Sequence, residues 1–438
     1  MLHKDFSFSM INYYIFGAHS RGRTVKEYLR VLKSNMRLLA YLYDNDEENP
    51  AEADGVPVIK VSGANEIIGM NSPGQDPSLS RLDIDCPVYI GTRGVSHPHI
   101  IEVLTRQGFT DIRPVTVDLD ILMRNAYVKI IFKEKRLSFR KIQVQSIGKE
   151  SGNESNALPS WKETAPNVIS KTDDNAESRT KNTCCIYVAK SANDKKLSAE
   201  WVLDEQEKIL QVGCALTEEK VAGAAYFDDQ GENISDCNKQ FCELTGLYWI
   251  WKHATQDVVG LVHYRRHFLL PEGWERYFAA ATISPDLKSL GVVVSADEAS
   301  GTSISYNDKA DVILPVPLYV APSLAGNFRD RHVPAIWETM MEALAEGDVE
   351  EAKRAEAFFE TNGLYCPCNM LIARREILSR LCGWLFPILF KVETRIGTLA
   401  DPYQNRYPGF LSERLITFWF YEHREAYRIW FADKNFLQ

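Results

Sequence analysis

The sequence lacks any apolar run long enough to cross a membrane. A spanning helix needs about 20 apolar residues, and the two strongest apolar stretches, 312–320 and 381–390, fall short of that. Pro315 and Pro317 interrupt the first. The second favours a helix buried in a core, and peripheral association with a membrane is the open alternative. The N-terminus also lacks the basic region and apolar run of a secretory signal, so we expect neither a signal nor a transmembrane segment.

Basic residues are too few for general binding to nucleic acid. Lys and Arg total 50 against 59 Asp and Glu, which gives a formal net charge of −9. A surface that displaces counterions from nucleic-acid phosphates must be basic, so we expect no nucleic-acid partner. The balance still permits a local cluster of arginines that binds a small phosphate ligand.

The nine cysteines lack the spacing of a zinc finger or ribbon. Cys184 and Cys185 are adjacent. Cys366 and Cys368 are separated by one residue, with no two further ligands nearby in the sequence, so we interpret these two as packing residues. A reducing compartment is the simpler interpretation of the nine cysteines. The prediction is a cytoplasmic location, with the inner face of the membrane as the alternative.

A polar segment divides the chain of 438 residues into two blocks. Residues 146–182 hold few large apolar side chains, and these follow neither a helical nor a strand period. Such a segment buries too little surface to offset the entropy of ordering it. The sequence therefore predicts an N-terminal domain over 1–145, a flexible linker over 146–182 and a C-terminal domain over 183–438.

The N-terminal block alternates strand-like and helix-like runs. Patterns of buried strands occur at 13–16, 38–43 and 86–91, and a helical pattern covers 99–107. This alternation predicts a Rossmann-like domain, in which helices cover a parallel sheet.

The turn after the first expected strand suits an anionic ligand. It reads Gly17-Ala-His-Ser-Arg-Gly22, and glycine lets the backbone approach a phosphate where a helix begins. The spacing is not G-x-G-x-x-G, so the motif alone is weak. Together with Tyr43-Asp-Asn-Asp46 and Ile90-Gly-Thr-Arg93, the turn resembles the nucleotide-sugar-binding domain of bacterial sugar acyltransferases of the sialic acid and bacillosamine type.

That resemblance implies a nucleotide sugar or related phosphate ligand at Gly17, Arg21, Gly22 and Asp44. The acyltransferases continue into hexapeptide repeats, and the sequence contains none, so the acylation chemistry is not carried over. A docking or scaffold domain that keeps only the fold is the alternative.

The C-terminal block contains the more distinctive sequence. We expect a strand at 184–190, a polar loop at 227–235, a helix at 238–252 and a strand at 257–262. The last strand runs directly into His263-Tyr-Arg-Arg-His267. Ligands of open α/β sheets gather at the carboxyl ends of strands, so this basic run marks the expected site.

Several motifs of this block resemble, in their order, a family of bacterial capsular and exopolysaccharide glycosyltransferases long known only as a domain of unknown function. The residues that carry the resemblance are Asp229, Gly231, 233–235, 242–245, 247–252, 260–266, 369–370, 384–386 and 409–415. The resemblance covers about 184–425. It implies a GT-A-like α/β domain that binds a nucleotide-sugar donor.

A sugar transferase must offset the charge that builds on the leaving diphosphate. Many GT-A enzymes use a divalent ion held by Asp-x-Asp at the end of a central strand, but here that position reads His263-Tyr264-Arg265. The three Asp-x-Asp matches in the chain all lie in the N-terminal block. We therefore predict no metal site and no required cofactor, and a divalent cation (Mn²⁺ or Mg²⁺) stays open as the alternative.

Arg265 and Arg266, with His263, are the predicted partners of the diphosphate, because guanidinium pairs with phosphate in bidentate fashion. A salt-bridged strand end is the alternative, and His267 is interpreted as structural. Glu413, at the start of an expected helix, is the candidate general base, with a helix cap or half of a salt bridge as its alternative.

Donor contacts are expected from Asp229, Asn233 and Glu243, in addition to the two arginines. Asn369 ends an expected strand at 365–369 and is assigned to the acceptor side.

The predicted function is transfer of a hexose from a nucleotide-diphosphate donor to a lipid-linked or oligosaccharide acceptor, in capsular, exopolysaccharide or O-antigen synthesis. Galactofuranose and galactose are the hexoses considered. The alternative is a noncatalytic assembly protein that binds a nucleotide sugar or glycan, in which the missing Asp-x-Asp marks lost activity.

Overall fold

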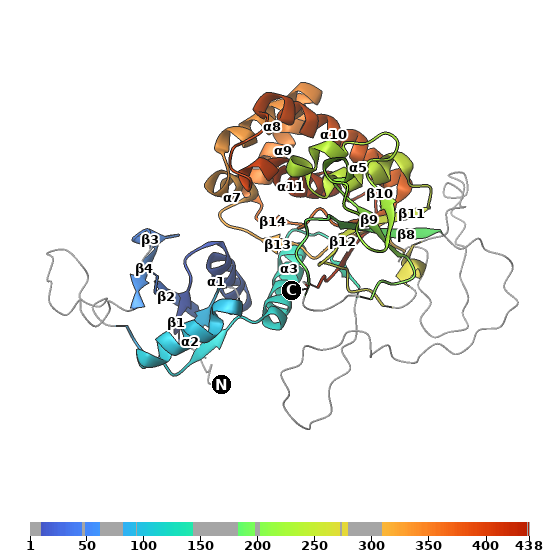
Figure 1. Ribbon diagram of the computed structural model, residues 1–438. Helices are drawn as coiled ribbons and strands as arrows, with labels where there is room; N and C mark the ends of the chain where they lie inside the picture. Colours follow the sequence, from blue (N-terminus) through green and yellow to red (C-terminus); the bar gives the residue numbers. More distant parts are fainter. Residues whose placement is uncertain are drawn as a thin grey trace, which may run out of the picture. The chain divides into compact units, whose positions relative to one another are not determined.

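Hydrophobic strands form one main sheet in each of two units of the chain. The computed structural model describes residues 10–45, 49–61, 82–92, 94–142, 183–197, 202–271, 274–278, 309–435 and 437. One unit comprises Met1–Ser138 with Leu318–Asn327, and the other Phe139–Pro317 with Phe328–Gln438 (Figure 1). The expected linker, together with Asp46 and Arg93, lies outside the described residues. The boundaries at 145 and 182 stay predictions.

The first unit contains a six-stranded sheet in the order β3-β4-β2-β1-β5-β6. Its strands are β1 (Ile11–Phe16), β2 (Met36–Tyr43), β3 (Glu52–Ala53), β4 (Val56–Lys60), β5 (Val88–Ile90) and β6 (Ile112–Pro114). Its helices are α1 (Ser20–Leu32), α2 (His97–Arg106) and α3 (Val117–Glu134), and the short β13 (Leu318–Tyr319) also belongs to it. Every pairing is parallel except that of β3 with β4.

The second unit contains an eight-stranded sheet in the order β10-β9-β8-β11-β15-β12-β16-β7. Its strands are β7 (Arg140–Lys141), β8 (Cys184–Lys190), β9 (Glu207–Gln211), β10 (Ala224–Phe227), β11 (Val258–His263), β12 (Val312–Pro315), β15 (Leu371–Arg374) and β16 (Ile429–Ala432), and β14 (Leu364–Tyr365) lies outside this sheet. Only β15 runs antiparallel to its two neighbours. Two mixed, mostly parallel α/β sheets confirm the predicted fold class.

Helices cover the second sheet. They are α4 (Asn238–Phe241), α5 (Leu244–His253), α8 (Pro334–Gly347), α9 (Val349–Thr361), α10 (Arg375–Ile396) and α11 (Tyr407–Glu422), and α7 spans Leu324–Arg331. Figure 1 shows α5 and α8 to α11 gathered on one face of the sheet. All six residues of β11 are buried, as a strand in the middle of a parallel sheet requires.

The helix expected over 238–252 is interrupted. Cys242 adopts a left-handed backbone (φ 49°), which ends α4 at Phe241 and starts α5 at Leu244. A single continuous helix was therefore the wrong expectation. The break places Glu243 in front of the first turn of α5 instead of on a helix face.

The apolar stretch at 381–390 belongs to the core. Within α10, Leu381, Leu385, Phe386 and Leu389 are fully buried. This confirms the expectation of a buried helix over that of a membrane-facing one. Among the described residues, every helix is too short or too polar to pass through a lipid bilayer.

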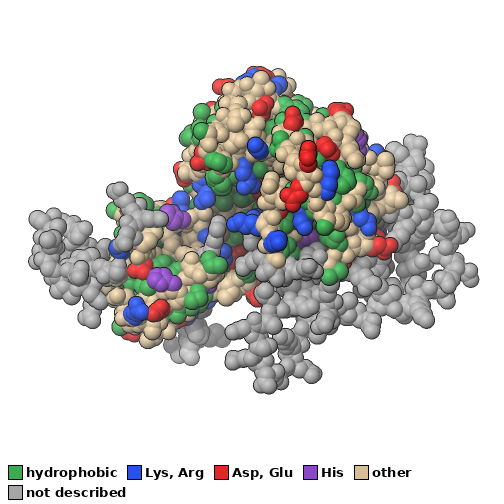
Figure 2. All heavy atoms as spheres, viewed as in Figure 1, with side chains coloured by type: hydrophobic (Ala, Val, Ile, Leu, Met, Phe, Trp, Pro, Cys, Tyr) green, Lys and Arg blue, Asp and Glu red, His purple; other side chains and the backbone are tan. Residues whose placement is uncertain are grey.

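Charged side chains are patterned locally. On the face shown in Figure 2, Lys and Arg side chains gather in places, although the formal net charge of the chain is −9. Net charge is therefore a poor guide to any single site on this surface.

Candidate functional site

The carboxyl end of β11 lies between two other segments of the sheet. Parallel pairing sets His263 beside Ala189 at the end of β8. Antiparallel pairing sets Leu261 beside Leu371, so the residues that lead into β15 lie next to those that leave β11. Topology thereby brings Asn369 close to His263, although the two are far apart in sequence.

His263 is buried and held at both ring nitrogens. Its Nε2 lies 2.6 Å from the carbonyl oxygen of Cys368, which can only accept, so Nε2 carries the proton. Its Nδ1 is 3.5 Å from Nη1 of Arg266, which can only donate. Burial lowers the pKa of His263, and Arg266 lowers it further, against the opposing effect of Glu243. His263 is therefore a neutral imidazole at pH 7.

Glu243 faces this histidine from the start of α5. Its Oε1 is 3.9 Å from His263 Nε2 and accepts a hydrogen bond of 2.8 Å from Asn369 Nδ2. Asn369 is almost fully buried (2% exposed), donates also to the carbonyl of Gly409 at 3.1 Å, and accepts from Ser412 Oγ at 2.7 Å. Because its amide is fully bonded within the protein, Asn369 supports Glu243 rather than presenting a free polar group.

Glu413 is a carboxyl group poised near neutral pH. Burial raises its pKa to about 7; Glu243 adds to the rise, while Arg414, the Cys368 N–H and Arg266 oppose it. The backbone N–H of Cys368 donates to its Oε1. The side chain keeps 16% of its surface exposed, so a bound hydroxyl can reach it. A carboxyl with a pKa near 7 suits general acid–base chemistry.

Glu413 lies further into its helix than expected. Helix α11 begins at Tyr407, so Glu413 is in the second turn and caps no helix end. The capping alternative for this residue is therefore wrong. Arg414 beside it is buried, with Nη1 bonded to the Phe410 carbonyl at 2.8 Å and 3.9 Å from Glu413 Oε2.

The two arginines of the β11 turn act on different groups. Arg266 acts electrostatically on Glu413 and His263, whereas Arg265 acts on Asp194 in the loop after β8. Burial raises the pKa of Asp194, and the Ser191 N–H and Arg265 offset this only in part. Asp194 is a member of the cluster that sequence reasoning missed, since a lone aspartate after a strand carries no distinctive pattern.

A buried contact between His267 and Glu207 holds this turn. His267 Nδ1 lies 2.8 Å from Glu207 Oε1, and both residues are at most 5% exposed. The His267 backbone N–H donates to Asn435 Oδ1 at 2.7 Å. These contacts agree with the structural interpretation of His267.

The adjacent aspartates after β10 differ in role. Asp228 is fully buried and accepts from the N–H groups of Gly213 (2.9 Å) and Cys214 (3.0 Å). It also accepts from the hydroxyls of Ser235 and Thr245. Asp229, the residue predicted as a donor contact, is exposed. Asp228 thus joins the turns at 213–214 and at Ser235 to the first turn of α5, and the sequence offered no means to choose between the two aspartates.

Asn233 closes its own loop. Its Nδ2 donates to the carbonyls of Asp229 (3.0 Å) and Gly231 (2.8 Å), and its Oδ1 accepts from the Ser235 N–H at 3.1 Å.

Of the predicted site residues, the structure brings together Glu243, His263, Arg266, Asn369 and Glu413. It leaves Asp229 and Asn233 in a separate loop. Donor contact by the last two stays a prediction.

Residues 186–424, more than half of the chain and all but the outer ends of this unit, match the protein family described as "Domain of unknown function (DUF4422)". The chain belongs to this family. The DUF4422 region contains every residue of the cluster at the end of β11. The description names no activity, so function has to be argued from the site.

The solved structures that are similar to this DUF4422 chain have low TM-scores. The apo structure of the bifunctional glycosyltransferase WbbM is 24% identical with a TM-score of 0.44, over 59% of this chain and 46% of that one. The chain therefore spans about half the length of that protein. A Rex-family repressor, RSP, and its complex with β-NADH are each 16% identical over 29% of this chain, with a TM-score of 0.19. These scores carry no conclusion, and no curated protein sequence matches the chain.

The N-terminal loop lies outside the DUF4422 match. Gly17 ends β1 in a left-handed conformation (φ 104°), and a Cβ on Gly22 would lie 1.8 Å from the Gly17 carbonyl oxygen. Packing alone therefore requires these glycines. Arg21 Nη2 reaches the Val115 carbonyl at 3.4 Å, and Asp44 Oδ2 lies 3.4 Å from His99 Nε2. Ligand binding at this loop stays a prediction.

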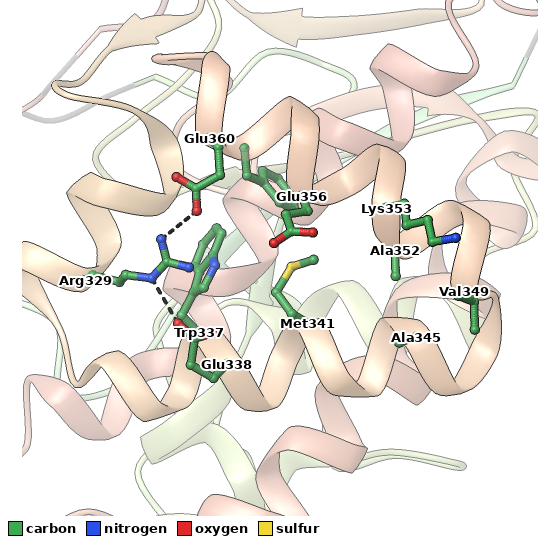
Figure 3. Close-up of a pocket in the computed structure, with 11 residues that line it drawn as sticks. Arg329, Trp337, Glu338, Met341, Ala345, Val349, Ala352, Lys353, Glu356 and Glu360 are labelled. Carbon is green, nitrogen blue, oxygen red and sulfur yellow. Dashed lines mark hydrogen bonds and ion pairs between the residues drawn. The ribbon is translucent and has the colours of Figure 1, made fainter.

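A pocket of about 220 Å³ opens between α8 and α9 of the DUF4422 unit. Figure 3 shows Arg329 beside Trp337, bonded to Glu338 and Glu360, and Met341 on the pocket floor. None of the lining residues belongs to the cluster at the end of β11.

Within the described residues, no three His, Cys, Asp or Glu side chains group as a metal site would. That turnover requires no metal ion stays a prediction.

Proposed function

We propose that this protein is a glycosyltransferase that moves a hexose from a nucleotide-diphosphate donor to a glycan acceptor. The observation that carries the proposal is Glu413, a partly exposed carboxyl with a pKa near 7 on which the Arg266 guanidinium acts electrostatically at the carboxyl end of β11. The resemblance of the motifs at 229–266 and 369–415 to bacterial polysaccharide glycosyltransferases supports the same reaction class.

The reaction needs a base and a partner for the leaving group. As the acceptor hydroxyl attacks the anomeric carbon, its proton passes to the Glu413 carboxylate, and a new carbon–oxygen bond forms. The bond from the anomeric carbon to the diphosphate breaks, and the electron pair leaves with the phosphate oxygen. Arg266 and Arg265 offset this developing charge by guanidinium–phosphate pairing.

His263 has a supporting part in this proposal. Its Nε2–H is bonded to the Cys368 carbonyl and its Nδ1 faces Arg266, so it orients the arginine instead of accepting the substrate proton. Glu243, next to it, is the proposed contact for donor hydroxyls. The acceptor would approach Glu413 from the side of α11. Galactose and galactofuranose are the donor sugars proposed, in capsular, exopolysaccharide or O-antigen synthesis.

The test is turnover of nucleotide sugars by the purified full-length protein. UDP-galactose and UDP-galactofuranose are supplied with an oligosaccharide acceptor, with and without Mn²⁺, and release of UDP is measured alongside glycosylated product. We expect transfer by the wild type, and its loss in Glu413→Gln with retained donor binding. Arg265→Ala should weaken binding of the donor.

The alternative is a noncatalytic protein that binds a nucleotide sugar or glycan. Calorimetry separates the two functions. Tight binding of a UDP-sugar without hydrolysis or transfer would support the binding protein. Neither binding nor turnover, with Arg265→Ala indistinguishable from wild type, would end both readings of this site.

A further inference from the structure

Two consecutive residues, Cys368 and Asn369, contact three ionisable side chains of the candidate site. The Cys368 N–H donates to Glu413, and the Cys368 carbonyl accepts from His263. The Asn369 side chain donates to Glu243. One dipeptide is therefore bonded to side chains from α11, β11 and the start of α5.

The backbone of this dipeptide is unusual. Both residues have positive φ, 74° for Cys368 and 51° for Asn369. Asparagine tolerates this region, but cysteine does not favour it, and a non-glycine residue there is strained. A strand continuing through 365–369, the sequence expectation, would point these groups elsewhere; β14 ends instead at Tyr365. Strain of this kind concentrates at functional sites.

Further contacts fix Asn369 from the opposite side. Ser412 Oγ donates to its Oδ1 at 2.7 Å, and the Gly409 carbonyl accepts from its Nδ2 at 3.1 Å. Ser412 directly precedes Glu413 in α11. The amide thus connects the helix that carries Glu413 to the carboxylate of Glu243.

We infer that the Cys368–Asn369 dipeptide is the positioning element of this site: its backbone orients Glu413 and His263, and the Asn369 amide orients Glu243. The inference rests on the proposed transferase function for its kinetic test. The dipeptide contacts no substrate atom in this assignment. It acts through the carboxylates and through the histidine that faces Arg266.

Two glycine variants isolate the effect of the Asn369 amide. Asn369→Gly keeps the left-handed conformation and removes the bond to Glu243. Arg136→Gly is the matched control, because Arg136 is an exposed left-handed residue (φ 56°) outside the cluster, and its replacement leaves all the hydrogen bonds of the cluster in place. We expect Asn369→Gly to lower kcat about 10–100-fold, as loss of a supporting contact does. The donor KM should hardly change, and Arg136→Gly should behave like wild type.

A milder variant guards against misfolding. Ser412→Ala removes one partner of Asn369 and should lower kcat by a smaller factor, again with little change in KM. Thermal unfolding establishes that each variant is folded. The inference is overturned if Asn369→Gly keeps the wild-type kcat, if Arg136→Gly loses as much activity as Asn369→Gly, or if KM alone responds.

A second measurement needs no turnover. NMR of full-length protein labelled with ¹⁵N-histidine reads the tautomer of His263, with His263→Gln assigning the signal. We expect a neutral ring protonated at Nε2 in wild type. A ring protonated at Nδ1 alone at pH 7 would overturn the role of the Cys368 carbonyl, even in an active enzyme. If the wild type uses neither UDP-sugar, the proposed function fails with these donors, and the NMR result still decides this inference.

Discussion

Replacing Asp228 by alanine should lower the free energy of unfolding of the second unit, because Asp228 is a fully buried acceptor for four donors. The hydroxyls of Ser235 and Thr245 can rotate, and Thr245 already has the Cys242 carbonyl at 3.1 Å. The N–H groups of Gly213 and Cys214 cannot turn away. Each buried donor left without an acceptor costs about 1–3 kcal/mol, so the two together lower the free energy of unfolding by about 2–6 kcal/mol.

Tryptophan fluorescence during urea unfolding measures this loss selectively. The sequence of the first unit, 1–138 with 318–327, contains no tryptophan, so this unit does not contribute to the signal. Asp229→Ala is the matched control, since Asp229 is exposed and a surface change alters stability by about 0.5 kcal/mol or less. If Asp229 contacts the donor, its replacement weakens donor binding at unchanged stability. If Asp228→Ala lowers the free energy of unfolding by less than about 1 kcal/mol, the cost assigned to the two N–H groups left without an acceptor is refuted.

Three further changes test other parts of the second unit. Glu413→Gln should lower kcat about 10²–10⁴-fold. The kcat of the wild type should rise with pH through about 7, because Glu413 must be ionised to act as a base. UDP release measured over a pH series should show no such rise in the variant. Arg266→Ala should raise the donor KM about tenfold or more, as loss of a charge-assisted phosphate contact does, whereas the exposed Arg354, paired with Glu422, should be replaceable by alanine without effect on KM. Asp311→Asn should cost about 3–5 kcal/mol of unfolding free energy, because Asp311 is bonded to Arg428 at 2.7 Å and to Arg374 at 3.2 Å. Burial opposes ionisation of Asp311, but hydrogen bonds from Arg428 outweigh this effect and lower the pKa of Asp311. The stabilising contribution of Asp311 is therefore present at neutral pH and lost as the pH falls through the lowered pKa. Urea unfolding at neutral and at acid pH measures this contribution.

Much of the sheet could be predicted from apolar patterning. The strand at 184–190 matches β8, and the strand expected at 257–262 matches β11 to within one residue at each end. Both are continuous apolar runs, which burial on two faces explains. The antiparallel entry of β15 between β11 and β12 could not be predicted, because pairing between distant segments leaves no local pattern.

The site was predictable at its charged residues and not at its supports. The basic run after β11 led to His263 and Arg266, and the motif at 409–415 led to Glu413. Their common partner was missed, because Cys368 contributes only backbone N–H and carbonyl groups, which every non-proline residue has. The break at Cys242 was missed for a related reason: a left-handed non-glycine residue has no sequence signal of its own.

The way the chain passes between its two units constrains the order in which they can be completed during synthesis. Strand β7, at the end of the first third of the chain, pairs with β16, which a ribosome releases almost last. The first unit in turn includes Leu318–Asn327, where the carbonyl of Tyr319 accepts from Thr24 Oγ1 at 3.0 Å. The first unit therefore lacks residues 318–327 until most of the second has been translated, and β7 lacks its partner until almost the whole chain has been made. A ribosome-stalled chain that ends before residue 318 should leave β7 unpaired and the first unit incomplete, and depend on chaperones until translation resumes.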